Sequence, residues 1–118
     1  MTGPGAAAGT TVQRSGASQS VLAEGPDSIL IGDCDDNGAK GADMLIEQTA
    51  GAATVWWNTN VVSSSTASTV QVTPESALDF AVIVQVGHGS RVSTYTATQT
   101  YDSGADICSF TAQVLTTT

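Results

Sequence analysis

Residues 78–101 read LDFAVIVQVGHGSRVSTYTATQTY, and the alternation at the start of this stretch decides the fold class. From residue 78 to residue 86 every second side chain is large and apolar, which is the period of a β-strand that turns one face to a hydrophobic core. The GHGS segment at 87–90 then favours a tight turn, because glycine readily adopts positive φ angles. We therefore predict an antiparallel hairpin with strands at 78–87 and 91–101.

Similar runs of β-branched and aromatic residues occur before and after this hairpin. A turn at 102–106 leads into a third strand at 107–116, so this part of the chain is expected to form a three-strand meander. The period-two spacing predicts one core face shared by these strands, made of Phe80, Val82, Val84, Phe110, Ala112 and Val114. Further strands are expected at 20–23, 27–32, 44–48, 53–58 and 68–73.

The whole pattern predicts an all-β fold: a single antiparallel β-sandwich, immunoglobulin-like or jelly-roll-like, with a small barrel as the alternative. A chain of 118 residues fits one domain with one core. We place the sandwich at 20–118 and an extended N-terminal arm at 1–19. Because the arm is rich in glycine and Val12 is its only large aliphatic residue beyond Met1, we expect it to be flexible, or ordered by a partner chain through Val12 and Arg14.

The charge balance narrows the classes of partner. The chain has 3 basic and 11 acidic residues, which gives a formal net charge of −8. It should repel phosphate backbones and anionic lipid surfaces, so we expect neither nucleic acid nor a membrane as its partner. The sequence also lacks an apolar run near the ~18 residues of a membrane span, and its first residues do not have the pattern of a secretory signal peptide.

The two cysteines are Cys34 and Cys108, with 73 residues between them. Two thiols and the single histidine, His88, do not complete a four-ligand zinc site without a carboxylate. A disulfide and a pair of free thiols both remain open. A disulfide would require an oxidising location, such as a virion or an extracellular surface.

An acidic loop at 32–43 reads GDCDDNGAKGAD. Asp33, Asp35 and Asn37 alternate and a glycine follows, which is the spacing in the first half of an EF-hand calcium loop. The position that should supply a bidentate carboxylate holds Met44, so a helical EF-hand is excluded. Beside the simpler interpretation of a polar turn, a calcium site in a β-loop stays open, with the ligands Asp33, Asp35, Asn37 and Asp43. We expect no other cofactor.

Trp56 and Trp57 are adjacent, so in a strand they point to opposite faces and only one can enter the core. The other ring is expected to meet a partner chain, because tryptophan is enriched where interfaces exclude water. Two alternatives remain: simple cover of a sheet face, and a platform on which a sugar ring stacks.

The sequence gives little support to catalysis. His88 lies in a Gly-His-Gly turn, and the chain lacks the glycine-flanked nucleophile of the hydrolases. The acidic residues Asp102 and Asp106 lie in a turn, where carboxylates are normally solvated. We therefore expect no catalytic residues and no enzyme.

The chain length, the glycine-rich arm at 1–19 and the strand-rich body resemble the small head-decoration proteins of tailed bacteriophages. This resemblance implies a non-enzymatic structural protein that decorates and stabilises a capsid lattice through its arm and an exposed sandwich face. Its partner would be the major capsid protein or another lattice protein, and its location the virion, after assembly in the host cytoplasm. The alternatives are a homo-oligomer, and an extracellular carbohydrate-binding or adhesion module that uses an exposed tryptophan.

Overall fold

The computed structural model describes residues 6–14, 19–35, 41–51, 53–58, 62–74 and 78–117, and for 6–14 and Asp35 it describes the backbone only. These residues form ten β-strands: β1 (Ala6–Arg14), β2 (Ser20–Glu24), β3 (Ser28–Asp35), β4 (Gly41–Gln48), β5 (Thr54–Asn58), β6 (Val62–Ser65), β7 (Thr69–Gln71), β8 (Phe80–His88), β9 (Arg91–Asp102) and β10 (Ile107–Thr117). Among the described residues, none belongs to a helix that could cross a membrane.

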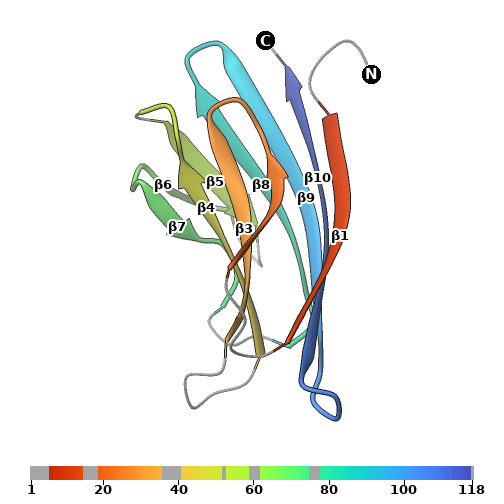
Figure 1. Cartoon of the computed structure of the whole chain (residues 1–118). Coiled ribbons are helices and arrows are strands. Elements are labelled where there is room, and N and C mark those ends of the chain that lie inside the picture. Colours follow the sequence, from red (N-terminus) through yellow and green to blue (C-terminus); the bar gives the residue numbers. More distant parts are fainter. Residues whose placement is uncertain are drawn as a thin grey trace.

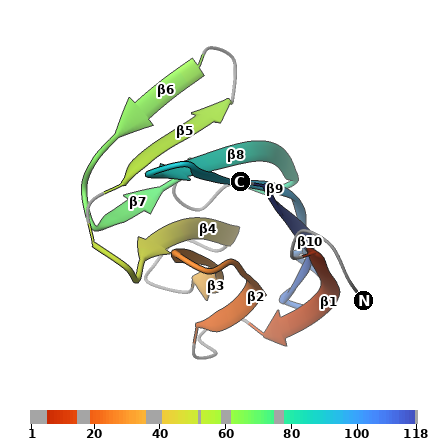
Figure 2. The same cartoon turned by 90° about the horizontal axis from the view of Figure 1, so that it is seen from above.

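The strands form two antiparallel sheets that pack against each other (Figure 1). The larger sheet has the order β1-β10-β9-β8-β5-β6, and the smaller one has the order β2-β3-β4-β7. Seen from above, the six-stranded sheet curves around the four-stranded one, which brings β1 close to β2 (Figure 2). The predicted all-β sandwich is therefore confirmed.

The predicted meander is the central part of the larger sheet. β8 pairs with β9 across a turn in which Gly89 has a φ of 62°, and β9 pairs with β10. Five of the six residues predicted for the shared core face are buried: Val82, Val84, Phe110, Ala112 and Val114. Phe80 is only partly buried and packs against the edge of the core cluster.

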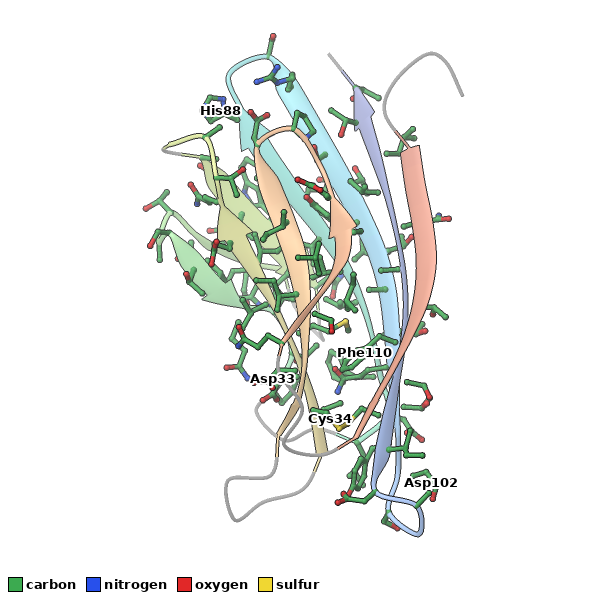
Figure 3. The ribbon with its side chains drawn as sticks, in the orientation of Figure 1. Asp33, Cys34, His88, Asp102 and Phe110 are labelled. Carbon is green, nitrogen blue, oxygen red and sulfur yellow. A yellow bond between two sulfur atoms is a disulfide. The ribbon has the colours of Figure 1, made fainter. Side chains whose placement is uncertain are left out.

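A disulfide joins the two sheets through the core. Cys34 on β3 and Cys108 on β10 are both fully buried, with an S–S distance of 2.07 Å and a Cα–Cα distance of 5.7 Å. Cys34 is labelled in Figure 3, where the sulfur atoms lie between the sheets. Of the two possibilities that the sequence left open, the structure contains the bridge.

The N-terminal segment differs from the expectation of an arm that only another chain orders. Residues 6–14 form β1, which pairs with β10 of the same chain from Ala6 opposite Leu115 to Arg14 opposite Ile107. A β-ladder is built from backbone hydrogen bonds, so a segment of small residues can join an edge strand without apolar side chains of its own. Residues 1–5 and 15–18 lie outside the described part of the chain.

Two other strand predictions needed adjustment. The serine-rich strand β6 was not predicted, because serine has little β-propensity and the strand is recognisable only by its pairing with β5. β3 and β4 extend further into the acidic loop than expected, so Asp33 and Asp43 are strand residues.

Candidate functional site

The four-stranded sheet turns one face to the core, and its opposite face is only partly exposed to solvent. The core side of β3 and β4 is formed by Leu30, Met44 and Ile46, so the residues between them point outward. The register of β2, β3 and β4 places the outward side chains in three cross-strand rows: Glu24, Ile29 and Glu47; Val21, Ile31 and Leu45; Asp33 and Asp43. We call this surface the acidic face.

The apolar row of the acidic face lies between the two rows that carry carboxylates. Val21 is 53% exposed, Leu45 is half-buried and Ile31 is buried. Glu24 and Glu47 are exposed on one side of this row. Asp33 lies on the other side, next to the disulfide end of β3 (Figure 3).

Two residues of the predicted calcium loop face each other in this arrangement. Asp33 is directly opposite Asp43, which is buried. The structure does not describe the side chain of Asp35 or any part of Asn37. In the part of the chain that the structure describes, no group of three or more His, Cys, Asp or Glu side chains could hold a metal ion. A calcium site in this loop stays a prediction.

The outer surface of the six-stranded sheet has a different chemistry. β5, β6, β8 and β10 contain no Asp, Glu, Lys or Arg, and on β9 the charged residues Arg91 and Asp102 stand at the two ends. We call the part of this surface on β5, β6, β8, β9 and β10 the neutral face; the edge strand β1 brings the position of Arg14 to the same side. Its central rows hold Trp56, Asn58, Ile83, Thr96, Thr98, Thr111 and Gln113.

The two tryptophans lie on opposite sides of β5, as predicted. Trp57 packs against the core cluster, whereas Trp56 lies on the neutral face and is 40% exposed. Gly87 of β8 lies against its ring, since a Cβ atom at this position would come within 3.0 Å of Trp56 Cζ3. A glycine on a strand leaves space for an aromatic ring to lie against the sheet, so the backbone of β8 supports Trp56.

Val12 and Arg14, the predicted partner contacts of the arm, are opposite Ser109 and Ile107 on β10. By this register their positions fall on the same side of the six-stranded sheet as Trp56, and Trp57 falls on the other side. The structure therefore assigns three of the four predicted partner-binding positions to one side of this sheet.

The neutral face contains an open hollow of about 780 Å³. Residues from β5, β8, β9 and β10 line it, and its outward side chains include Asn58, Ile83, Thr96, Thr98, Thr111 and Gln113. The hydroxyl groups of Thr98 and Thr111 are hydrogen-bonded to each other. Trp56 lies two residues from Asn58 on the same side of β5, but its ring lies over Gly87, at the end of β8 away from Ile83 and the hollow.

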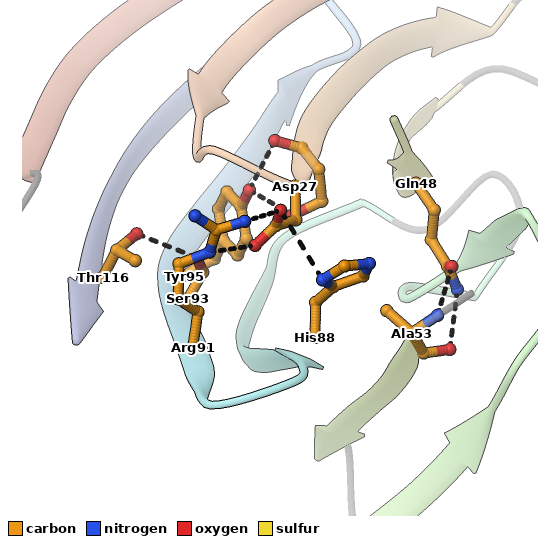
Figure 4. Close-up of polar contacts among 9 residues, drawn as sticks. Asp27, Gln48, Ala53, His88, Arg91, Ser93, Tyr95 and Thr116 are labelled. Atoms are coloured by element: carbon orange, nitrogen blue, oxygen red, sulfur yellow. Dashed lines mark hydrogen bonds and ion pairs between the residues drawn. The ribbon is translucent and has the colours of Figure 1, made fainter. Parts of the chain in front are cut away.

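A partly buried polar cluster connects the sheets at the end of the sandwich that carries the β8–β9 turn (Figure 4). The Arg91 guanidinium donates two hydrogen bonds to the Asp27 carboxylate, from Nε to Oδ2 at 3.0 Å and from Nη2 to Oδ1 at 2.7 Å. His88 Nδ1 lies 3.8 Å from Asp27 Oδ1. Asp27 belongs to the turn between β2 and β3, so this cluster ties a turn of one sheet to a hairpin of the other.

Tyr95 extends the same connection deeper into the sandwich. Its hydroxyl donates to the backbone oxygen of Ser28 at 2.9 Å, accepts from the backbone N–H of Gly25 at 3.2 Å and lies 2.6 Å from Ser28 Oγ. Burial raises the pKa of Tyr95 above its ordinary value. The hydroxyl of Ser93 is likewise engaged, with Thr116. The polar groups around His88 are thus paired in contacts that hold the sheets together.

The acidic residues of the β9–β10 turn have structural contacts as well. Asp102 Oδ1 accepts hydrogen bonds from the backbone N–H groups of Gly104 at 2.9 Å and Ala105 at 3.2 Å. The Tyr101 hydroxyl donates to Asp106 Oδ1 at 2.6 Å, and this hydrogen bond raises the pKa of Tyr101 to about 12. These carboxylates therefore stabilise the turn.

Sequence reasoning missed the separation of charge between the two outer faces. The signal was present, because the segments of the meander are almost free of charged residues while the segments that form the smaller sheet contain several acidic residues. Assigning these strands to different sheets required the structure.

Comparisons of the chain with protein-family models, with curated proteins and with solved structures found no match.

Proposed function

We propose that this protein is a non-enzymatic structural accessory of a larger particle, such as a viral capsid, and that it attaches to the particle through the acidic face. The observation that carries this proposal is the exposed Val21 and half-buried Leu45, which lie between the carboxylates of Glu24 and Glu47 on one side and that of Asp33 on the other. Protein interfaces commonly combine an apolar centre with a polar rim.

The charge of this face indicates the chemistry of its partner. Glu24, Glu47 and Asp33 surround an exposed Val21 in a chain whose net charge is −8. A lattice protein with lysine or arginine side chains around an apolar patch would be complementary to it. Such complementarity raises the association rate and selects the partner.

The N-terminal strand provides a backbone edge beside β2 of the acidic face, while its positions Val12 and Arg14 fall on the side of the neutral face. β1 is an edge strand of its sheet and lies beside β2. An edge strand has backbone N–H and C=O groups that can pair with a strand of another chain. A lattice protein bound to the acidic face at β2 could therefore also pair with β1, as the resemblance to decoration proteins implies.

The disulfide supports the proposed location. A buried bridge between Cys34 and Cys108 is typical of proteins that are exposed to an oxidising environment. A virion surface meets this condition, and so does the alternative, an extracellular site. The major capsid protein or another lattice protein is the proposed partner, and a second copy of this chain is the alternative.

Purified virus particles from the source organism test the proposal. Quantitative mass spectrometry of density-gradient fractions should find the chain in the particle fraction. Particles that were assembled without the chain are then incubated with recombinant protein. The variant Glu24→Lys/Glu47→Lys should bind to these particles less than the wild type does. The matched control is Thr94→Lys/Thr96→Lys on the neutral face, which should bind normally.

Salt provides the second measurement. Raising the ionic strength from about 0.1 M to about 1 M shortens the Debye length from about 10 Å to about 3 Å, so occupancy of the wild type should fall. Particles that lack the chain, or equal occupancy for wild type and Glu24→Lys/Glu47→Lys at low salt, would contradict the proposal.

A further inference from the structure

The hollow on the neutral face has the size and lining of a ligand site. Its volume of about 780 Å³ lies within the range of small-molecule sites, about 300 to 1,000 Å³. It spans four neighbouring strands, which together provide a rigid floor. It is open to solvent along its length, so an extended ligand can enter without any movement of the chain.

The side chains of the hollow determine what kind of ligand fits. Thr96, Thr98 and Thr111 carry hydroxyl groups that both donate and accept hydrogen bonds, and the amides of Asn58 and Gln113 add donors and acceptors. A ligand rich in hydroxyl groups can donate hydrogen bonds to these side chains and accept hydrogen bonds from them.

The absence of charge on the central rows favours a neutral ligand. An ionised group is stabilised at a protein surface by an opposite charge, and β5, β8 and β10 have none to offer. The chain has 11 acidic residues, and the opposite side of the sandwich carries carboxylates. The lack of charge is therefore a property of this face and not of the chain as a whole. Phosphorylated or sulfated ligands are therefore disfavoured.

Trp56 provides the apolar contact that hydroxyl-rich ligands use. Its ring is 40% exposed and its position against Gly87 restricts its motion. Ile83, which is 55% exposed, adds apolar surface inside the hollow. The apolar face of a sugar ring can stack on such an indole, and a ring that is already held in place loses little entropy on binding.

We propose that the neutral face binds an uncharged oligosaccharide that is long enough to stack one sugar ring on Trp56, pass over the row of Gln85 and occupy the hollow toward Gln113. This inference goes beyond attachment to a particle, because it uses the opposite side of the sandwich. A protein attached through its acidic face would present the neutral face to solvent, and the particle would gain a glycan-binding surface.

Affinity electrophoresis of the intact, oxidised protein tests this inference. The gels contain neutral polysaccharides (a β-glucan, a xylan, a mannan and a dextran), with alginate as the anionic control. At least one neutral gel should retard the protein, and alginate should not. A glycan array then identifies the preferred neutral oligosaccharide, and calorimetry gives its Kd.

Two variants locate the site. Trp56→Ala should weaken binding by about tenfold or more, as expected for a central aromatic contact. Ala81→Arg, on an exposed position that lines the hollow, should block it. Val21→Ala on the acidic face is the matched control and should bind as the wild type does, and thermal melts establish that all three variants are folded.

Three results would overturn the inference. The first is no binding to any neutral glycan on the gels or the array. The second is binding that survives both Trp56→Ala and Ala81→Arg. The third is self-association of the wild type in sedimentation experiments that Trp56→Ala abolishes, which would assign the neutral face to a second copy of the chain. None of these outcomes depends on attachment through the acidic face.

Discussion

At the scale of single residues, the structure separates side chains that build the core from those available for contact. Phe110 is 1% exposed, whereas Phe80, from the same predicted core face, is only partly buried. Phe80 is the first residue of β8, and the end of a strand can extend beyond the sheet that covers it. Trp57 and Trp56 differ for another reason, because adjacent residues of a strand point to opposite faces.

The substitution Phe110→Ala tests the packing of the core. It removes a large side chain from a fully enclosed position, and the free energy of unfolding should fall by about 3 to 5 kcal/mol. Urea unfolding followed by tryptophan fluorescence measures this loss. Phe80→Ala is the comparison and should cost less. A loss below about 1 kcal/mol for Phe110→Ala, as is common at surface positions, would contradict the assigned register.

At the scale of elements, the turns at the two ends of the sandwich are held by side chains. At one end the carboxylate of Asp27 binds Arg91 of the β8–β9 hairpin. At the other end Asp102 and Asp106 organise the turn between β9 and β10. The carboxylates of Asp27, Asp102 and Asp106 thus have backbone or side-chain partners.

The Tyr101–Asp106 hydrogen bond predicts alkaline sensitivity of the β9–β10 turn. The pKa of Tyr101 is raised from 10.0 to about 12 in the folded chain. A raised folded pKa means that the contribution to stability is complete below pH 10 and is lost as the pH rises toward 12. An absorbance titration of tyrosinate should show this late step.

Two variants assign the step. Tyr101→Phe should remove it, and Asp106→Asn should move it back toward 10.0. Asparagine tolerates the positive φ of 58° at this position, so the turn should keep its backbone. A titration of Asp106→Asn that matches the wild type would contradict the role of this hydrogen bond.

At the scale of the whole molecule, the disulfide and the partly buried polar cluster connect the two sheets at different places. The bridge joins β3 to β10, and the Asp27–Arg91 pair joins the β2–β3 turn to the β8–β9 hairpin. Both connections hold the sheets in one relative position. The acidic face and the neutral face are therefore presented on opposite sides of one rigid body.

Removal of the disulfide should destabilise the domain strongly. Cross-linking residues 74 positions apart lowers the entropy of the unfolded chain and is worth about 4 kcal/mol. The double variant Cys34→Ala/Cys108→Ala should show this loss in urea unfolding. Because both sulfur atoms are buried, a reductant should act quickly only when denaturant is present. Free thiols in the unreduced native protein would contradict the bridge.

Several features could be read from the sequence because they depend on local order. The alternation around Phe80 to Val86 determines a strand with one core face wherever that strand is placed, and the adjacent tryptophans must point to opposite sides of any strand. The glycines around His88 likewise indicate a turn from their own conformational freedom. The strand-rich class and the β8–β9–β10 meander follow from these local properties.

Other features depend on contacts between distant residues, and only the tertiary structure decided them. β1 is a strand because β10 offers it an edge, and Cys34 meets Cys108 because β3 and β10 face each other across the core. The two outer faces differ because β2, β3 and β4 are in one sheet while β8, β9 and β10 are in the other. A period of two tells which residues share a side of a strand, but which sheet the strand joins is determined by pairing and packing over the whole chain.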